Sequence, residues 1–247
     1  MLNKTFALGF ACLVLLLQSC TKPNEQKSGY EIEGNQVVFY HGHPAQKEAV
    51  READPNTFKS INSDYGKDKK QVFYWGKILP KADPVSFVCL GWPFSRDKHY
   101  GFSTDRILSE DGSHFEIISN PKDLEAEGVI YARDSHRVYA KKGVVEGADP
   151  KTFVIVPMFS RNYLAHDHKQ VYWLDKPLEG VDGGSFQRLT EYHFKDKNAV
   201  WDYLMANQSR WRPKPGADLQ SFEGLGRFYA RDKNRVYYKD VTVEGAD

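Results

Sequence analysis

The sequence predicts an all-β protein in which about seven related antiparallel β-hairpin units form a curved or ring-like array. Three observations support this prediction: a composition rich in strand-forming residues, a turn motif that recurs along the chain, and a second signature between the turns. The 247 residues include 15 Phe, 14 Tyr and 5 Trp, and such side chains suit a pleated, partly buried sheet. Because repeat proteins grow by adding units, the length does not require separate globular domains.

Residues 1–19 have the pattern of an export signal. Lys4 precedes the twelve-residue apolar stretch Phe6–Leu17, which is too short to span a bilayer comfortably. Leu17-Gln18-Ser19-Cys20 is typical of a bacterial lipobox, so Cys20 is the predicted lipidated N-terminus of the mature protein. An ordinary secretory signal peptide is the alternative.

Residues 20–29 are predicted to be the lipidated cysteine and a polar tether. A flexible stretch of this length spans roughly 15–18 Å, so the folded part would lie close to the membrane. Several acyl chains on one residue hold a protein durably. The predicted location is therefore the bacterial cell envelope, at the outer membrane in a Gram-negative cell.

From Tyr30 onward, a turn aspartate recurs every 29 to 37 residues, with Glu33 in its place in the first copy. A basic residue precedes each aspartate, and an aromatic residue stands five positions after it. Valine stands four positions after it in five of six copies. Adjacent strand residues point to opposite faces, so both faces of each hairpin are apolar and the units must stack or wrap. The turn aspartates are Asp68, Asp97, Asp134, Asp167, Asp196 and Asp232.

The second signature, Ala-Asp-Pro-x-Ser/Thr-Phe, is complete at Ala53–Phe58, Ala82–Phe87 and Ala148–Phe153, with three looser copies. An aspartate before proline favours one capped helical or 3₁₀ turn, and the phenylalanine then leads an apolar strand. One unit is thus predicted as a hairpin, a short third strand, a capped turn and a fourth apolar run. A β-propeller is the alternative, although units of about 33 residues are short for a blade of 40–45.

The motif Asp232-Lys233-Asn234-Arg235-Val236-Tyr237-Tyr238 and its copies at Asp68–Tyr74 and Asp196–Trp201 resemble the DKNYY repeat family. The resemblance covers residues 30–247, the predicted repeat domain. It implies a bacterial protein, usually exported or lipid-anchored, of unassigned biochemical function. It brings no catalytic residues to this chain.

Charge and motifs exclude several function classes. Without residues 1–19 the chain has 33 basic and 33 acidic side chains, so no field concentrates phosphates and nucleic acid is not an expected partner. No phosphate-binding loop, nucleophile elbow or zinc-protease motif occurs. The turn aspartates recur six times, which favours a structural role, because an aspartate opening a turn bonds its own backbone. Two pairs of histidines could bind a metal ion, in His41-Gly42-His43 and His166-Asp167-His168, but a surface role is preferred for both. Neither a metal nor a cofactor is predicted.

The irregular segments are the better candidates for function. Trp92 lies outside the repeat pattern, and an insertion over Asp202–Gly216 places Arg210, Trp211 and Arg212 in a predicted loop. Aromatic and arginine side chains on loops are common in binding sites, although each tryptophan could instead fill a gap between units. The predicted function is an envelope binding or scaffold module, not an enzyme, which recognises an envelope protein, peptide or glycan. The alternative is an envelope hydrolase with a site assembled between repeats.

Overall fold

The computed structural model describes residues 27–118, 131–156, 164–204 and 210–245. The predicted signal peptide, Cys20 and the first part of the tether lie outside these residues. Within the described ranges, no helix is both long and apolar enough to cross a membrane.

The described chain forms seven small antiparallel sheets, A to G, in chain order. Sheet A contains β1 (Gly29–Glu33), β2 (Gln36–His41) and β3 (Gln46–Ala49); sheet B contains β4 (Lys59–Ser60), β5 (Tyr65–Lys67), β6 (Val72–Tyr74) and β7 (Lys77–Ile78). Sheet C contains β8 (Val88–Gly91), β9 (Phe94–Arg96), β10 (Gly101–Ser103) and β11 (Arg106–Ser109); sheet D contains β12 (Glu116–Ile118), β13 (Tyr131–Arg133), β14 (Val138–Ala140) and β15 (Gly143–Val144).

The last three sheets repeat the same four-stranded meander. Sheet E contains β16 (Val154–Val156), β17 (Leu164–His166), β18 (Gln170–Trp173) and β19 (Lys176–Asp182); sheet F contains β20 (Gln187–Arg188), β21 (His193–Lys195), β22 (Val200–Leu204) and β23 (Arg210–Pro213). Sheet G contains β24 (Glu223–Gly224), β25 (Tyr229–Arg231), β26 (Val236–Tyr238) and β27 (Val241–Val243). The prediction of seven all-β units is confirmed.

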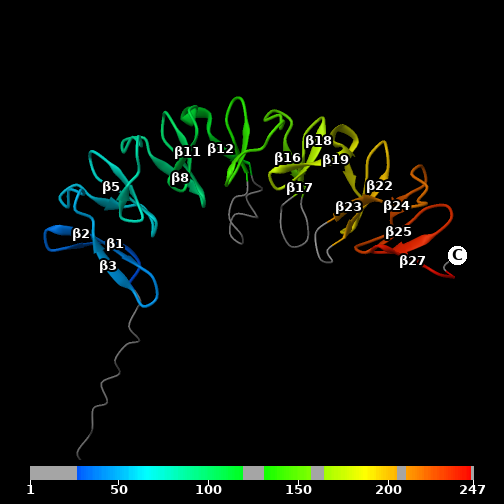
Figure 1. Cartoon of the computed structure of the whole chain (residues 1–247), viewed down its shortest axis with the longest axis horizontal. Helices are drawn as coiled ribbons and strands as arrows, with labels where there is room; N and C mark the ends of the chain where they lie inside the picture. Colours follow the sequence, from blue (N-terminus) through cyan, green and yellow to red (C-terminus); the bar gives the residue numbers. More distant parts are fainter. Residues whose placement is uncertain (1–26, 119–130, 157–163, 205–209, 246–247) are drawn as a thin grey trace, which may run out of the picture.

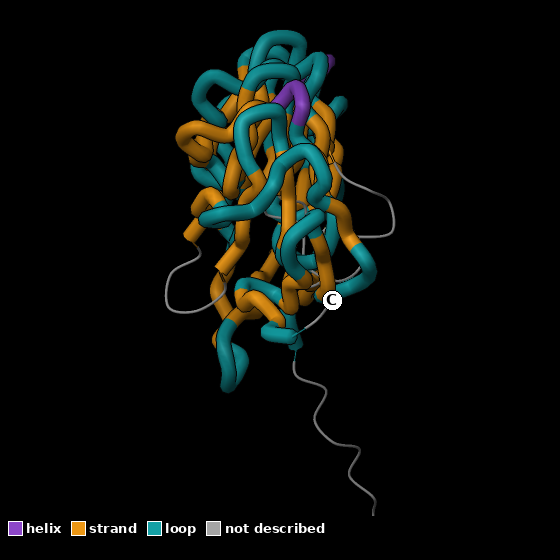
Figure 2. Tube along the Cα trace, turned by 90° about the vertical axis from the view of Figure 1, so that its right-hand side faces the viewer, coloured by secondary structure: helices purple, strands orange, loops and turns teal. Residues whose placement is uncertain are grey.

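The sheets follow one another along an open arc, with sheets A and G at its two ends (Figure 1). Seen from the side, the array is a narrow slab of strands and loops (Figure 2). The two 3₁₀ turns, η1 (Gly112–His114) and η2 (Gly183–Ser185), lie on the outer edge of the arc. The curved array is thus open across the described residues, which form neither a closed ring nor a propeller.

The order of strands within a unit differs from the predicted order. The apolar run led by a phenylalanine pairs with the hairpin that follows it: β8 pairs with β9, and β16 pairs with β17. The capped turn therefore links two sheets and does not lie inside one. The reason is a hydrogen bond that holds the capped turn to the next hairpin, in which the Asp83 amide donates to Asp97 Oδ2 at 2.8 Å.

Each turn aspartate is buried and organises the joint between two sheets. Asp97 Oδ1 accepts from the amides of His99 and Tyr100, both at 2.7 Å, while its other oxygen receives the amide of Asp83. Four further aspartates accept the same three bonds, namely Asp68, Asp167, Asp196 and Asp232. Asp134 Oδ1 accepts the same two turn amides, from His136 and Arg137, but its Oδ2 accepts from the hydroxyls of Ser109 and Tyr139 in place of a capped-turn amide. The predicted structural role of these aspartates is confirmed.

The lysine of the Asp-Lys pair joins the same two loops from outside. Lys98 Nζ lies 3.3 Å from Asp83 Oδ2, and the Lys98 amide donates to Ser86 Oγ. Equivalent ion pairs form at Lys69–Asp54, Lys197–Asp182 and Lys233–Asp218. The two signatures found in the sequence are therefore the two halves of one joint.

The phenylalanine of each capped turn fills the space between consecutive sheets. The Phe153 ring lies 5.1 Å from Tyr131 of sheet D and 5.5 Å from Tyr172 of sheet E. The small residues two positions before the turn aspartates make room for this ring: a Cβ on Gly66 would come within 2.3 Å of Phe58 Cζ. The core is thus a series of aromatic contacts along the arc.

Candidate functional site

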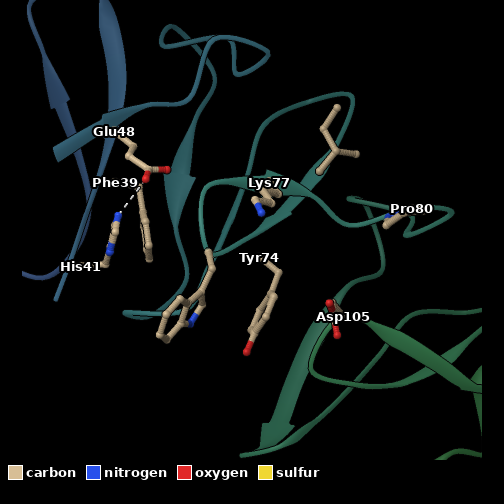
Figure 3. A pocket seen from close by; sticks show the side chains of 9 residues that line it. Phe39, His41, Glu48, Tyr74, Lys77, Pro80 and Asp105 are labelled. Atoms are coloured by element: carbon tan, nitrogen blue, oxygen red, sulfur yellow. Dashed lines mark ion pairs between the residues drawn. The ribbon is translucent and has the colours of Figure 1, made fainter. Parts of the chain in front are cut away.

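An open groove runs along sheets A, B and C, at the opposite end of their strands from the turn aspartates. Because those turns and the capped turns form the outer edge of the arc, the groove lies on the inner side. Its volume is about 590 Å³ and its lining residues are Phe39, His41, Glu48, Tyr74, Trp75, Lys77, Ile78, Pro80 and Asp105. Figure 3 shows these side chains, which come from three consecutive sheets.

The aromatic part of the groove is held by the repeat's own turn. Trp75 has a φ of +48° and Gly76 one of +72°, which gives a tight two-residue turn between β6 and β7. Thr104, Leu174 and Lys239 have the same left-handed conformation in their units. The strained backbone therefore belongs to the repeat, and only the tryptophan side chain is special to this position.

The Trp75 side chain is exposed at 51% but oriented. Its Nε1 donates to Asp64 Oδ1 at 3.1 Å, and its ring lies 6.1 Å from Phe39 and 6.3 Å from Tyr74. A large aromatic residue fixed in this way costs little conformational entropy when it binds a ligand. The groove thus presents a prepared aromatic surface.

Charged side chains surround the aromatic surface. His41 Nε2 lies 3.1 Å from Glu48 Oε1 on one side of the groove, and Asp105 lies on the other, with Tyr74 between them (Figure 3). Hydrogen-bonding groups on both sides and an apolar floor suit a polar ligand with flat or apolar faces.

The structure separates the binding residues predicted from the sequence. Trp92 lies between β8 and β9 of sheet C and is 52% exposed, with Lys141 Nζ 3.9 Å from the centre of its ring. Trp211 lies in sheet F, so the two tryptophans do not share a site. Neither residue lines the groove.

The prediction that Trp211 lies in a loop is wrong. Residues 210–213 form β23, in which Trp211 pairs with Tyr203 of β22. The Trp211 ring packs on Phe194 at 4.8 Å and on Phe186 at 6.2 Å, so much of it fills a gap beside sheet F. Arg212 is exposed, and the side chain of Arg210 lies outside the part described. A binding role for these residues stays a prediction.

A second departure from the repeat is a buried cluster between sheets F and G. Lys214 Nζ lies 2.9 Å from Asp202 Oδ2, and His193 Nε2 lies 3.9 Å from Asp202 Oδ1. Their side chains are at most 4% exposed. His193 Nδ1 bonds Thr190 Oγ1 at 2.9 Å, while its Nε2 has no hydrogen-bond partner among the described residues.

Burial sets the electrostatics of this cluster. It lowers the pKa of His193 to about 4, helped by the Lys214 ammonium. Burial also raises the pKa of Asp202, against the opposing effect of Lys214. The cluster is closed to solvent, so a substrate could not reach it in this conformation, and its contacts are those of a structural ion pair.

Sequence reasoning did not identify the groove or the cluster. One signal for the groove was present, because the segment between His41 and Arg51 departs from the repeat and supplies His41 and Glu48. The cluster had a signal too, since His193 and Asp202 occupy positions that are aromatic, aliphatic or small in most sister units. Within the described ranges, no three His, Cys, Asp or Glu side chains are grouped to hold a metal ion.

The model described as the DKNYY family matches residues 16–106 and 131–247. No curated protein and no solved structure matches the chain.

Proposed function

Because the chain belongs to the DKNYY family, we propose that it is a lipid-anchored cell-envelope module that binds a ligand and has no catalytic activity. Its ligand is an envelope protein, peptide or glycan, and the groove of sheets A, B and C receives it. The observation that carries the proposal is the oriented, half-exposed Trp75 in a groove of about 590 Å³.

The position of the groove supports a role near the membrane. The proposed tether ends at Gly29, the first residue of β1, and β1 belongs to the sheet that supplies Phe39, His41 and Glu48. With a tether of roughly 15–18 Å, the groove would be the part of the array nearest the anchor. A ligand at the membrane surface would therefore meet it first.

The anchor is tested by fractionation of cells that produce the full chain. We expect the protein in the membrane fraction and expect Cys20→Ser to release it, since the acyl chains supply the membrane affinity. A Cys20→Ser protein that stays with the membrane would contradict the lipid anchor.

The ligand is tested on glycan arrays, on panels of envelope peptides and by pull-down from envelope extracts. We expect saturable binding that Trp75→Ala weakens about tenfold or more, as is usual for a central aromatic contact. Trp92→Ala is the matched control, because Trp92 has the same exposure but lies outside the groove.

Two outcomes would count against this assignment. Loss of binding in Trp92→Ala and not in Trp75→Ala would move the site to sheet C. The absence of any saturable ligand in all three assays would contradict the binding function itself.

A hydrolase between repeats has less support. Such an enzyme needs several charged groups with shifted pKa values in an accessible pocket. The buried charges that converge, His193, Asp202 and Lys214, are closed off between two sheets. The binding module is therefore the preferred proposal.

A further inference from the structure

The groove of sheets A, B and C has a broad aromatic floor, which bears on the kind of ligand that it receives. The ring centres of Tyr74 and Trp75 are 6.3 Å apart, and the two ring planes are inclined by 32°. Trp75 is exposed at 51%, and Tyr74 beside it is half-buried. The two rings therefore form a continuous surface and not a deep pocket for a single side chain.

The charged side chains that line the groove are balanced in number. Glu48 and Asp105 supply two carboxylates, and His41 and Lys77 supply two basic groups. Such a lining has no strong field that would concentrate a highly charged polymer. An uncharged ligand therefore fits the groove better than a polyanion or a polycation.

The polar groups of the groove include both acceptors and donors of hydrogen bonds. Asp105 is exposed in the turn between β10 and β11, where its carboxylate can accept several hydrogen bonds. Partial burial raises the pKa of Tyr74, and the carboxylates of Asp64 and Asp105 raise it further. The Tyr74 hydroxyl therefore keeps its proton and can donate. A ligand that satisfies this groove needs both donors and acceptors beside an apolar face.

A neutral sugar chain combines these properties. Each sugar ring carries several hydroxyl groups that donate and accept, and its C–H groups form an apolar face that packs on the electron-rich face of an aromatic ring. A peptide offers one amide donor and one carbonyl per residue, and it is usually bound along a sheet edge or through pockets for single side chains. The aromatic floor and the flanking carboxylates therefore fit a sugar chain better than a peptide.

We propose that the ligand of this groove is a neutral oligosaccharide, which stacks a sugar ring on Trp75 and donates hydroxyl groups to Asp105 and Glu48. The inference rests on the proposed function and selects one of the ligand classes that it allows. Glu48 is held by His41 on one side of the floor, and Asp105 lies on the other (Figure 3). The two carboxylates thus recognise hydroxyl groups along both sides of the stacked sugar.

The test titrates the full chain with cellotriose and with chitotriose, two uncharged trisaccharides, by isothermal titration calorimetry. We expect saturable binding of at least one of them, weakened about tenfold or more by Trp75→Ala. Asp105→Ala should weaken it about fivefold or more, because a hydrogen bond to a charged group is lost. Added salt should leave the affinity unchanged, since the sugar carries no charge for ions to screen.

Asp175→Ala is the matched control for Asp105→Ala. Asp175 follows Leu174 in the two-residue turn of sheet E that corresponds to Thr104-Asp105 in sheet C, and it lies outside the groove. Its replacement should leave the affinity for either sugar unchanged. Trp75 and Asp105 are both exposed, so replacing them should not unfold the protein.

The outcomes separate this inference from the proposed function. Absence of saturable binding for both sugars, or equal affinity in the Trp75→Ala protein, would overturn the inference. If an envelope peptide binds in a way that depends on Trp75 while neither sugar binds, the ligand class is wrong and the binding function stands. If no sugar, peptide or extracted envelope protein binds, the proposed function fails as well.

Discussion

Two joints of the array have the same backbone arrangement, but apolar side chains pack in one and charged side chains in the other. Between sheets D and E, the positions that face the next sheet hold Tyr131, Ala140 and Val145, all buried. Between sheets F and G, the equivalent positions hold His193, Asp202 and Lys214. The equivalence of Val145 and Lys214 follows from their amides, which donate to the carbonyls of Val138 and Val200 at 2.8 and 2.7 Å.

The comparison distinguishes the residues that fix the geometry of a joint from the side chains that pack between its two sheets. Both joints keep the capped turn, the turn aspartate and the phenylalanine, with Phe153 in one and Phe222 in the other. The side chains around the phenylalanine can change from apolar to charged, provided that the charged groups pair with one another. The geometry that the two joints share thus comes from the two signatures, while the side chains packed around the phenylalanine can vary.

The largest expected effect is the loss of the phenylalanine, which tests whether it supports both joints. Phe153→Ala and Phe222→Ala should each cost about 3–5 kcal/mol of unfolding free energy, as is usual for buried phenylalanines. Denaturant melts followed by tyrosine and tryptophan fluorescence give both values. A small loss for Phe222→Ala alone would show that the polar joint is held by its charges instead.

Lys214→Ala tests the charged joint alone. It leaves the Asp202 carboxylate buried without its 2.9 Å partner, and breaking a buried pair in this way costs about 3–5 kcal/mol. Hydrogen exchange should show the loss in sheets F and G and not in sheets A to C. A loss spread evenly over the array would contradict a local role.

The matched variant copies one joint into the other. His193→Tyr, Asp202→Ala and Lys214→Val together reproduce the side chains of the joint between D and E. Because no buried charge is left over, the triple variant should be as stable as the parent or more stable by about 1–4 kcal/mol. A triple variant less stable than Lys214→Ala would mean that the two joints are not equivalent.

The pH dependence of stability should differ between the joints. The folded pKa of His193, about 4, is below its ordinary value of 6.5, so the unfolded chain binds this proton more readily. The stabilisation that depends on neutral His193 is therefore lost as the pH falls from about 6.5 to 4, by of order 3 kcal/mol. The raised pKa of Asp202 acts in the opposite sense at lower pH, and Lys214, Arg212 and Asp240 are the other charges nearby. Denaturant melts of the His193→Tyr variant and of the parent, repeated across this pH range, isolate the effect of the histidine. If the two unfolding free energies change with pH in parallel, the pKa of His193 is not depressed.

The smallest effect is expected at the outer edge of a joint. Lys233 pairs with Asp218 at 2.9 Å but is largely exposed, and exposed pairs contribute little. Lys233→Ala should therefore leave the denaturant midpoint within experimental error, and added salt should not change the comparison. A clear loss would show that the lysine of the motif is essential to the joint.

The sequence allowed the prediction of features that depend on local chemistry. The turn aspartates, the capped turns and the number of units each follow from residues a few positions apart. The pairing of β8 with β9 could not be predicted in this way, because the bond from the Asp83 amide to Asp97 crosses 14 residues. Trp211 was assigned to a loop because Arg and Pro flank it, whereas its strand depends on pairing with β22.

The candidate sites were harder to predict for a related reason. His193, Asp202 and Lys214 are ordinary polar residues in the sequence, and only the stacking of F on G buries them together. The groove likewise combines side chains of three sheets. The sequence shows which residues depart from the repeat, but not which of them meet.

The joint made by the two signatures has a consequence for how such a chain can evolve. Among the described residues, its longer bonds join one unit to the next, from the Asp218 amide to Asp232 across 14 residues and from Lys195 to the Phe222 carbonyl across 27. Duplication or deletion of a whole unit in the gene would therefore recreate every joint it interrupts. Genes of this kind can lengthen or shorten their product by recombination and still encode a protein that folds.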